Sequence, residues 1–239
     1  MSNPVMIVQA RMTSTRLPGK ILKTALGKTM LEFLVERLRR VRNVNNLVIA
    51  TTTNVTDEPI VELCRELGVD CFRGSELDVL ARYHGAAVQS QADPIIRITS
   101  DCPVIDPALV EIVVDTYLKG SFDYVCTDRG THPVGMNTEV FSFAALDRAM
   151  KDSVVQYDRE HVTPYIYKTR PDLFKIRKVM QSVDQSSHRW TLDTAEDFQL
   201  LSLIFENLYP KNKNFSIADM IDLMDQNPDW KKINEGSAK

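Results

Sequence analysis

The sequence contains no long hydrophobic run. No segment approaches the roughly 18 consecutive apolar residues that a membrane-spanning helix needs. The apolar run near the N-terminus, in MSNPVMIVQAR, is too short for a signal peptide, and no basic segment precedes it. We therefore expect a cytoplasmic protein that has no membrane partner.

The sequence is also poor in cysteine and has no excess of positive charge. Its four cysteines form no C-x-x-C pair and have no histidine at metal-finger spacing, so we expect reduced, mostly buried thiols. The formal net charge of -3 argues against a broad basic surface for nucleic acid. Any phosphate binding must therefore depend on a few well-placed cations.

The first half of the sequence alternates between expected strands and expected helices. Short apolar runs predict strands at 5–9, 47–51, 71–72, 95–99 and 124–126, and helical spacing predicts helices at 30–41, 58–67 (capped by Asp57), 77–89 and 107–118. This alternation predicts an α/β fold with a parallel sheet flanked by helices on both faces. Ligands bind such sheets at the carboxyl ends of the strands, which directs attention to the loops after Gln9, Thr99 and Trp190.

The second half is less regular. We expect a loop at 131–137, helices at 143–150 and 157–168, a strand at 174–180, and a short strand at 189–192 that leads into a helix from Thr194. No internal repeat, low-complexity segment or linker is visible. Residues 1–239 are therefore expected to form one domain.

The strongest functional signal is the loop that follows the first expected strand, QARMTSTRLPGK. It carries three cations, Arg11, Arg16 and Lys20, together with the hydroxyl of Ser14, and its Pro-Gly pair forces a turn. Such a loop can wrap a triphosphate with backbone N–H groups and cationic side chains, although it lacks the Walker A pattern. A solvated basic loop is the alternative, and the position at a strand's carboxyl end favours the functional interpretation.

Two aspartates also follow expected strands. Asp101 comes after the strand at 95–99, and Asp193 comes after the short strand at 189–192. Taken alone, Asp101 is better explained as an N-cap or turn residue. Asp193 or Thr194 could merely cap the helix that follows, with Glu196 or Asp197 favourable at its positive end. Together, Asp101 and Asp193 could converge on one Mg²⁺, which would neutralise phosphate oxygens and orient an α-phosphate for in-line attack. We therefore expect Lys20, Asp101 and Asp193 to be catalytic, with both aspartates as metal ligands.

The loop resembles the nucleotide-binding signature of the cytidylyltransferases that make CMP-Kdo and CMP-sialic acid. Four further segments resemble the spore-coat polysaccharide cytidylyltransferase-like branch of that family. They are RGSELDVLARY (73–83), RITSDCPVIDP (97–107), REHVTPYI (159–166) and RWTLDTAEDF (189–198). The resemblance keeps its order from residue 5 to about residue 205.

The resemblance implies a Rossmann-like nucleotide-diphospho-sugar transferase fold and a cytoplasmic homodimer. It implies transfer of CMP from CTP to an acidic sugar with release of pyrophosphate, in surface polysaccharide biosynthesis, with Mg²⁺ as cofactor. Carried over by position, Arg11, Ser14, Arg16 and Lys20 bind the nucleotide, and the backbone of Ala10 approaches the cytosine ring. Asp101 and Asp193 hold the metal.

The sugar-side segments of the Kdo and sialic acid enzymes have no clear counterpart here. Their place is taken by HPVGMNTEVF and REHVT, from which we select Glu139, Arg159 and His161 as sugar-binding residues. Arg159 could pair with a sugar carboxylate and Glu139 could accept hydroxyl hydrogen bonds. A solvated helix face for Arg159 and a core position for His161 are the alternatives.

Other functions of the same scaffold stay open. They are a nucleotidyltransferase with another nucleotide, a glycosyltransferase that uses a finished nucleotide-sugar, and a non-catalytic binding protein. A glycosyltransferase is disfavoured because the central strand ends in S-D-C-P, with one aspartate in place of a D-x-D pair. A non-catalytic protein would be expected to lose a loop cation or a metal aspartate, and this chain keeps them all.

Overall fold

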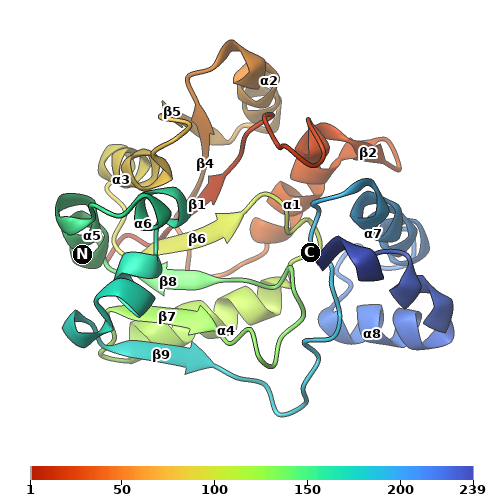
Figure 1. Ribbon diagram of the computed structural model, residues 1–239. Helices are drawn as coiled ribbons and strands as arrows, with labels where there is room; N and C mark the ends of the chain where they lie inside the picture. Colours follow the sequence, from red (N-terminus) through yellow and green to blue (C-terminus); the bar gives the residue numbers. More distant parts are fainter. Residues whose placement is uncertain (1, 239) are drawn as a thin grey trace.

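The computed structural model describes residues 2–238, which build a seven-stranded sheet in the order β5-β4-β1-β6-β8-β7-β9 (Figure 1). Pairing is parallel except at β8, which runs antiparallel to both of its neighbours. The predicted mostly parallel sheet is therefore confirmed, although β8 itself was not predicted. The strands are β1 Val5–Gln9, β4 Asn46–Thr52, β5 Asp70–Gly74, β6 Ile95–Thr99, β7 Tyr124–Thr127, β8 Glu139–Phe141 and β9 Ile176–Val179, with a separate hairpin of β2 Thr24–Ala25 and β3 Lys28–Thr29.

Helices cover both faces of the sheet, as expected. Along β1, Met6 and Val8 share a buried cluster with residues of α1, α4 and α7, while Val5 and Ile7 point to the other face and pack with residues of α3 and α5. Burial on both faces explains the unbroken apolar run of this strand. The helices are α1 Met30–Leu38, α2 Glu58–Leu67, α3 Val79–Gln89, α4 Pro107–Lys119, α5 Phe143–Asp152, α6 Gln156–His161, α7 Ala195–Leu208 and α8 Ile217–Gln226.

The predicted strand at 189–192 is wrong. This extended segment makes only an isolated bridge, between Val134 and Arg189, and its hydrogen bonds run to two different loops. Trp190 N donates to the carbonyl of Val134 at 2.7 Å, and Leu192 N donates to the carbonyl of Asp101 at 2.8 Å. The segment therefore connects the loop after β6 with the loop before β8, and it joins no ladder.

The continuous helix predicted at 157–168 is also wrong. α6 ends at His161, and Val162 then has φ 73° and ψ -58°. Thr163 N donates to the carbonyl of His161 at 2.9 Å, which closes a strained γ-turn. A short π-helical turn, Tyr165–Thr169, follows Pro164. The helix is therefore interrupted at the residues that border the site described below.

The C-terminal part returns to the tip of β6, where Figure 1 places the C-terminus. Two short 3₁₀ turns, η5 Pro228–Lys232 and η6 Glu235–Ala238, follow α8 on this path. In residues 2–238, no helix has both the length and the apolar character needed to cross a membrane.

Gly135 is the glycine that holds the extended segment against the loop before β8. It has φ 105°, and a Cβ placed there would lie 2.4 Å from the carbonyl oxygen of Trp190. We expect Gly135→Ala to lower the free energy of unfolding by a backbone cost of about 1–2 kcal/mol and a further overpacking cost of about 1–3 kcal/mol. Urea unfolding would measure the loss.

Gly27 supplies the matched control. It also has a positive φ, of 76°, but a Cβ there would meet nothing within 4 Å. Gly27→Ala should therefore show only the backbone cost. Equal losses in the two variants would show that the contact between Gly135 and Trp190 is unimportant.

Candidate functional site

The loop after β1 is folded back on itself and anchored to a buried carboxylate. Gly19 N donates to the carbonyl of Met12 at 2.9 Å, and Gly19 adopts the left-handed conformation that the turn requires. Met12 N donates to Asp57 Oδ1 at 2.8 Å. Asp57 is fully buried, and its other oxygen accepts hydrogen bonds from Thr51 and Thr52 of β4. Asp57 is the N-cap residue of α2, as predicted, but its side chain makes no capping bond to that helix and fixes the loop instead.

Eight of the ten predicted site residues line one cleft of about 310 Å³. Several lining residues were not predicted from the sequence, notably Gln9, Arg82, Ser100 and Glu160. The carboxyl ends of β1 and β6 supply most of the lining, as the parallel topology requires. The eight predicted residues are Ala10, Arg11, Ser14, Arg16, Lys20, Asp101, His161 and Asp193.

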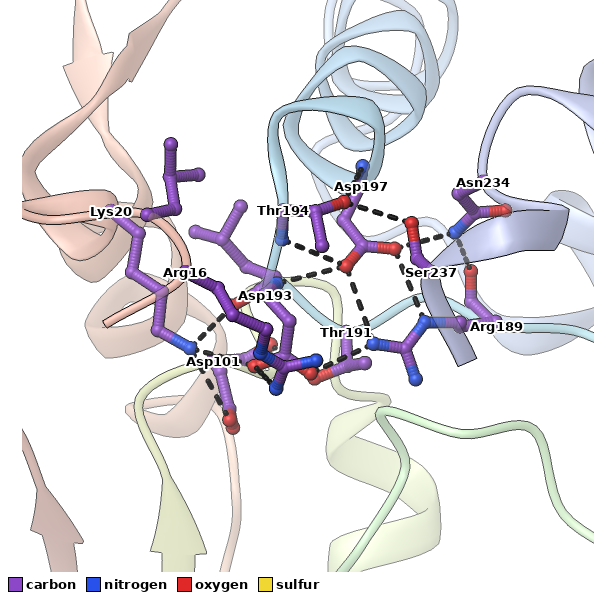
Figure 2. Close-up of polar contacts among 12 residues, drawn as sticks. Arg16, Lys20, Asp101, Arg189, Thr191, Asp193, Thr194, Asp197, Asn234 and Ser237 are labelled. Atoms are coloured by element: carbon purple, nitrogen blue, oxygen red, sulfur yellow. Dashed lines mark hydrogen bonds and ion pairs between the residues drawn. The ribbon is translucent and has the colours of Figure 1, made fainter. Parts of the chain in front are cut away.

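Lys20 lies between the two aspartates (Figure 2). Its Nζ is 2.9 Å from Asp193 Oδ1 and 3.7 Å from Asp101 Oδ2, and it donates to the carbonyl of Leu192 at 2.6 Å. Because both oxygens contact the same nitrogen, the two carboxylates cannot be farther apart than these two distances together. Two residues that are distant in sequence are thus brought to one point in the cleft.

Asp193 is held from behind by a buried polar network (Figure 2). Arg189 Nη2 donates to Asp193 Oδ2 at 2.8 Å, and Arg189 also pairs with Asp197, which is fully buried. Asp197 Oδ2 accepts hydrogen bonds from the backbone N–H groups of Asp193 and Thr194, both at 3.0 Å. Thr194 and Asp197 form a capping box at the start of α7, so Thr194 and not Asp193 is the cap of this helix.

The charge around Asp193 keeps it ionised. Burial alone raises the pKa of its carboxyl, but the hydrogen bond and charge of Lys20, aided by Arg16 and Arg189, outweigh burial and hold the pKa below its ordinary value. Arg16 Nη2 lies 3.0 Å from Asp193 Oδ1, with about half of its side chain exposed. Asp193 is therefore an anion that contacts three cations.

Asp101 is oriented by its own loop. Its Oδ1 accepts hydrogen bonds from Thr99 Oγ1 and, at 3.5 Å, from Cys102 Sγ. Burial raises the pKa of the Cys102 thiol, so this group stays protonated and can donate. The other oxygen, Oδ2, faces Lys20 across 3.7 Å.

Glu139 and Arg159 do not line this cleft. Arg159 pairs with Asp78 and donates to the carbonyl of Met150 at 3.0 Å, so its guanidinium joins α6 to the start of α3. Glu139 is buried on β8 and pairs with Arg97 of β6. Burial raises the pKa of Glu139, but the charge of Arg97 and the hydrogen bonds from Thr163, Tyr124 and Arg97 together outweigh burial and lower the pKa.

Glu139 lines a second cavity of about 450 Å³ between β7, β8 and β9. Arg97 connects the two hollows, because its Nη2 donates to Gln9 Oε1 at 2.9 Å while its Nη1 contacts Glu139. The two cavities are thus separated by about one side chain. His161, in contrast, is exposed on the rim of the first cleft, directly before the strained γ-turn at Val162.

The fold and the cleft define a nucleotide-binding α/β protein, and comparison with known proteins identifies its family. Residues 5–213 match the profile of the cytidylyltransferases, and the chain belongs to that family. Its activity is that of a sugar nucleotidyltransferase.

Full-length relatives support this placement. The chain is 41% identical to an uncharacterized protein of Methanocaldococcus jannaschii over 95% of this chain and 93% of the relative. It is 31% identical to the spore coat polysaccharide biosynthesis protein SpsF of Bacillus subtilis over 96% of this chain and 97% of the relative. A solved cytidylyltransferase from Leptospira borgpetersenii superposes with a TM-score of 0.91 at 33% identity, and covers 96% of this chain and 97% of that one.

The position of Lys20 predicts a pH-dependent contribution to stability. The lowered pKa of Asp193 stabilises the fold above the unfolded-state value of about 3.9, and this stabilisation is lost as the pH falls through the folded-state pKa. We expect Lys20→Met to reduce the free energy of unfolding by about 1–3 kcal/mol near neutral pH. The loss should be smaller at about pH 3, because Asp193 in the unfolded state takes up a proton below its pKa of about 3.9 and the stabilisation by Lys20 then falls. Urea unfolding at both pH values would measure it.

Arg65→Met is the control for this experiment. Arg65 forms an exposed ion pair with Glu62 on α2, and such pairs contribute about 1 kcal/mol or less. A loss in Lys20→Met that is the same at both pH values would show that Lys20 stabilises the fold by packing and not by its charge.

Proposed function

We propose that this protein transfers CMP from CTP to an acidic sugar and releases pyrophosphate, as a step in surface polysaccharide biosynthesis. The observation that carries the proposal is the position of Lys20 between Asp101 and Asp193, in a cleft that also contains the cations Arg11 and Arg16. A triphosphate needs several cations in one place, and transfer at its α-phosphate needs carboxylates that can share a metal with it. Membership of the cytidylyltransferases supports CTP as the nucleotide.

The donor set fits Mg²⁺. Among residues 2–238, no group of three or more histidine, cysteine, aspartate or glutamate side chains is arranged to hold a metal. Mg²⁺ at nucleotide sites needs fewer protein ligands, because one or two carboxylates are completed by substrate phosphates and water. We propose Asp101 and Asp193 as these two ligands. The bound ion would neutralise phosphate oxygens and help to orient the α-phosphate.

The loop residues take different parts in binding CTP. Arg11 and Arg16 have exposed side chains whose partners, Glu76 and Asp193, are carboxylates that a triphosphate can replace. Lys20 is nearly buried and keeps its place beside the aspartates. Ser14 adds a hydroxyl donor, and Ala10 brings its backbone to the end of the cleft where β1 stops, the position proposed for the cytosine ring.

The acceptor sugar enters from the side of α6. His161 and Glu160 line the cleft there, together with Arg82, and can recognise a carboxylate and hydroxyl groups. Glu139 and Arg159 do not line the cleft themselves. They act indirectly, because Glu139 pairs with Arg97 and Arg159 pairs with Asp78. A sugar hydroxyl then attacks the α-phosphorus, the bond to the bridging oxygen breaks, and pyrophosphate leaves towards Arg11 and Arg16. The proton of the attacking hydroxyl passes to solvent water.

Pyrophosphate release tests the proposed function. We expect the purified protein, supplied with Mg²⁺ and CTP, to release pyrophosphate with one or more sugar acids such as Kdo or sialic acid, and much less with neutral sugars. GTP and ATP should also bind more weakly than CTP in calorimetry. Equal binding of GTP would reject the cytosine assignment, and no release with any acceptor would reject the transfer reaction.

Replacing either aspartate tests the proposed metal site. Asp101→Asn and Asp193→Asn should each lower kcat by roughly 10²-fold or more, because each removes charge that stabilises the transition state. CTP affinity should change far less. The kcat of the double variant should be no lower than that of the less active single variant.

Thermal unfolding of each variant would separate loss of chemistry from loss of fold. Asp229→Asn, at an exposed ion pair with Lys232, serves as the control. Full activity in Asp193→Asn would leave that residue a purely structural role in its ion-pair network.

A further inference from the structure

The C-terminal segment packs against the network that holds Asp193, although it lies beyond the residues matched by the family profile (Figure 2). Asn234 and Ser237, on either side of the start of η6, are both buried. Ser237 Oγ lies 2.8 Å from Thr194 Oγ1, the capping hydroxyl of α7. A segment remote in sequence is thus joined to the residue that follows Asp193.

One side-chain amide makes the central contact. Asn234 Nδ2 donates to Asp197 Oδ1 at 2.8 Å and to the carbonyl of Arg189 at 3.0 Å. These two bonds use both hydrogens of the amide, and they join the carboxylate that orients Asp193 to the backbone of the arginine that contacts it. Asn234 is 5% exposed and Asp197 is 0% exposed, so water cannot readily replace either bond.

Asp197 depends on the amide of Asn234, because its other hydrogen-bond donors are held in place by the backbone and by Arg189 and cannot substitute for that amide. Its Oδ2 accepts the backbone N–H groups of Asp193 and Thr194, and its Oδ1 accepts Arg189 Nε at 3.2 Å and the amide of Asn234. Removal of the amide leaves a buried carboxylate oxygen short of one donor. The carboxylate can regain a partner only by turning, and turning weakens its hold on the N–H groups.

We propose that Asn234 is a positioning residue for the active site, which acts through Asp197 and Arg189 to hold Asp193 towards Lys20 and the nucleotide. It touches no substrate and contacts Asp193 only through these partners. Its activity readout rests on the proposed function, but its effect on the backbone of Asp193 can be measured without any reaction.

The test compares Asn234→Ala with Asn207→Ala. Asn207 is a matched control because its Nδ2 also donates to a backbone carbonyl, that of Leu203 within α7, but has no contact with the network. Hydrogen–deuterium exchange of peptides that cover residues 189–197 should be roughly tenfold faster at the protected amides in Asn234→Ala, as expected for the loss of one hydrogen bond to a charged group. Asn207→Ala should leave that exchange unchanged.

Kinetics on the same variants supply the second readout. Asn234→Ala should lower kcat by roughly tenfold and change the KM for CTP by less than about threefold, because only the position of Asp193 is altered. The same substitution made in Asp193→Asn should cause no further loss. Asn234→Asp should be at least as damaging, since it removes both donors and places a carboxyl beside buried Asp197.

Each result has a defined meaning. Unchanged exchange at residues 189–197 in Asn234→Ala would overturn the proposal, as would a loss of kcat that is additive with Asp193→Asn. Faster exchange with a selective fall in kcat would support it. If the wild-type protein releases no pyrophosphate from CTP, the proposed function fails, and the exchange comparison still decides whether Asn234 positions Asp193.

Discussion

One main-chain carbonyl, that of Asp101, holds the two halves of the site together. It accepts hydrogen bonds from Leu192 N at 2.8 Å and from Thr191 Oγ1 at 3.1 Å. These bonds place the residue after Leu192, which is Asp193, beside the side chain of Asp101 itself. The convergence of the two aspartates therefore depends on backbone bonds to a loop, and it does not require the strand that the sequence predicted.

The charges of the cleft are balanced internally before any ligand binds. Arg11 pairs with Glu76 at 3.7 Å, Arg16 pairs with Asp193, and Lys20 contacts both aspartates. These cations differ in exposure. The side chains of Arg11 and Arg16 are 42% and 49% exposed, whereas that of Lys20 is 12% exposed. Exposed ion pairs contribute little to stability, so the two arginines can change partners at small cost, whereas moving Lys20 would leave two carboxylates facing each other.

The sequence predicted features that depend on neighbouring residues, and it failed where partners are distant. The apolar run of β1 is a local pattern, and it predicted that strand correctly. The cations of the loop that follows are also a local pattern, and all three of them line the cleft. The interruption after His161 depends on a strained turn at a valine, which no propensity predicts. The sequence around Arg159 gives no sign of whether its guanidinium contacts a sugar or, as in the structure, Asp78. The loop anchor Asp57 could not be recognised, because its partner Met12 is far away in sequence.

The position of the site follows from a mismatch in the sheet. β8 pairs with β6 only at Ile95, Ile96 and Arg97, so the last residues of β6 have no strand beside them on that side. β1 continues alongside to the level of Thr99 and then turns into the loop that carries Arg11, Arg16 and Lys20. The extended segment that leads to Asp193 is hydrogen-bonded to the carbonyl of Asp101, just beyond the end of β6. The short antiparallel strand β8 therefore leaves the end of β6 unpaired close to the loop that carries Arg11, Arg16 and Lys20. Asp193, which is remote in sequence, completes the cleft there.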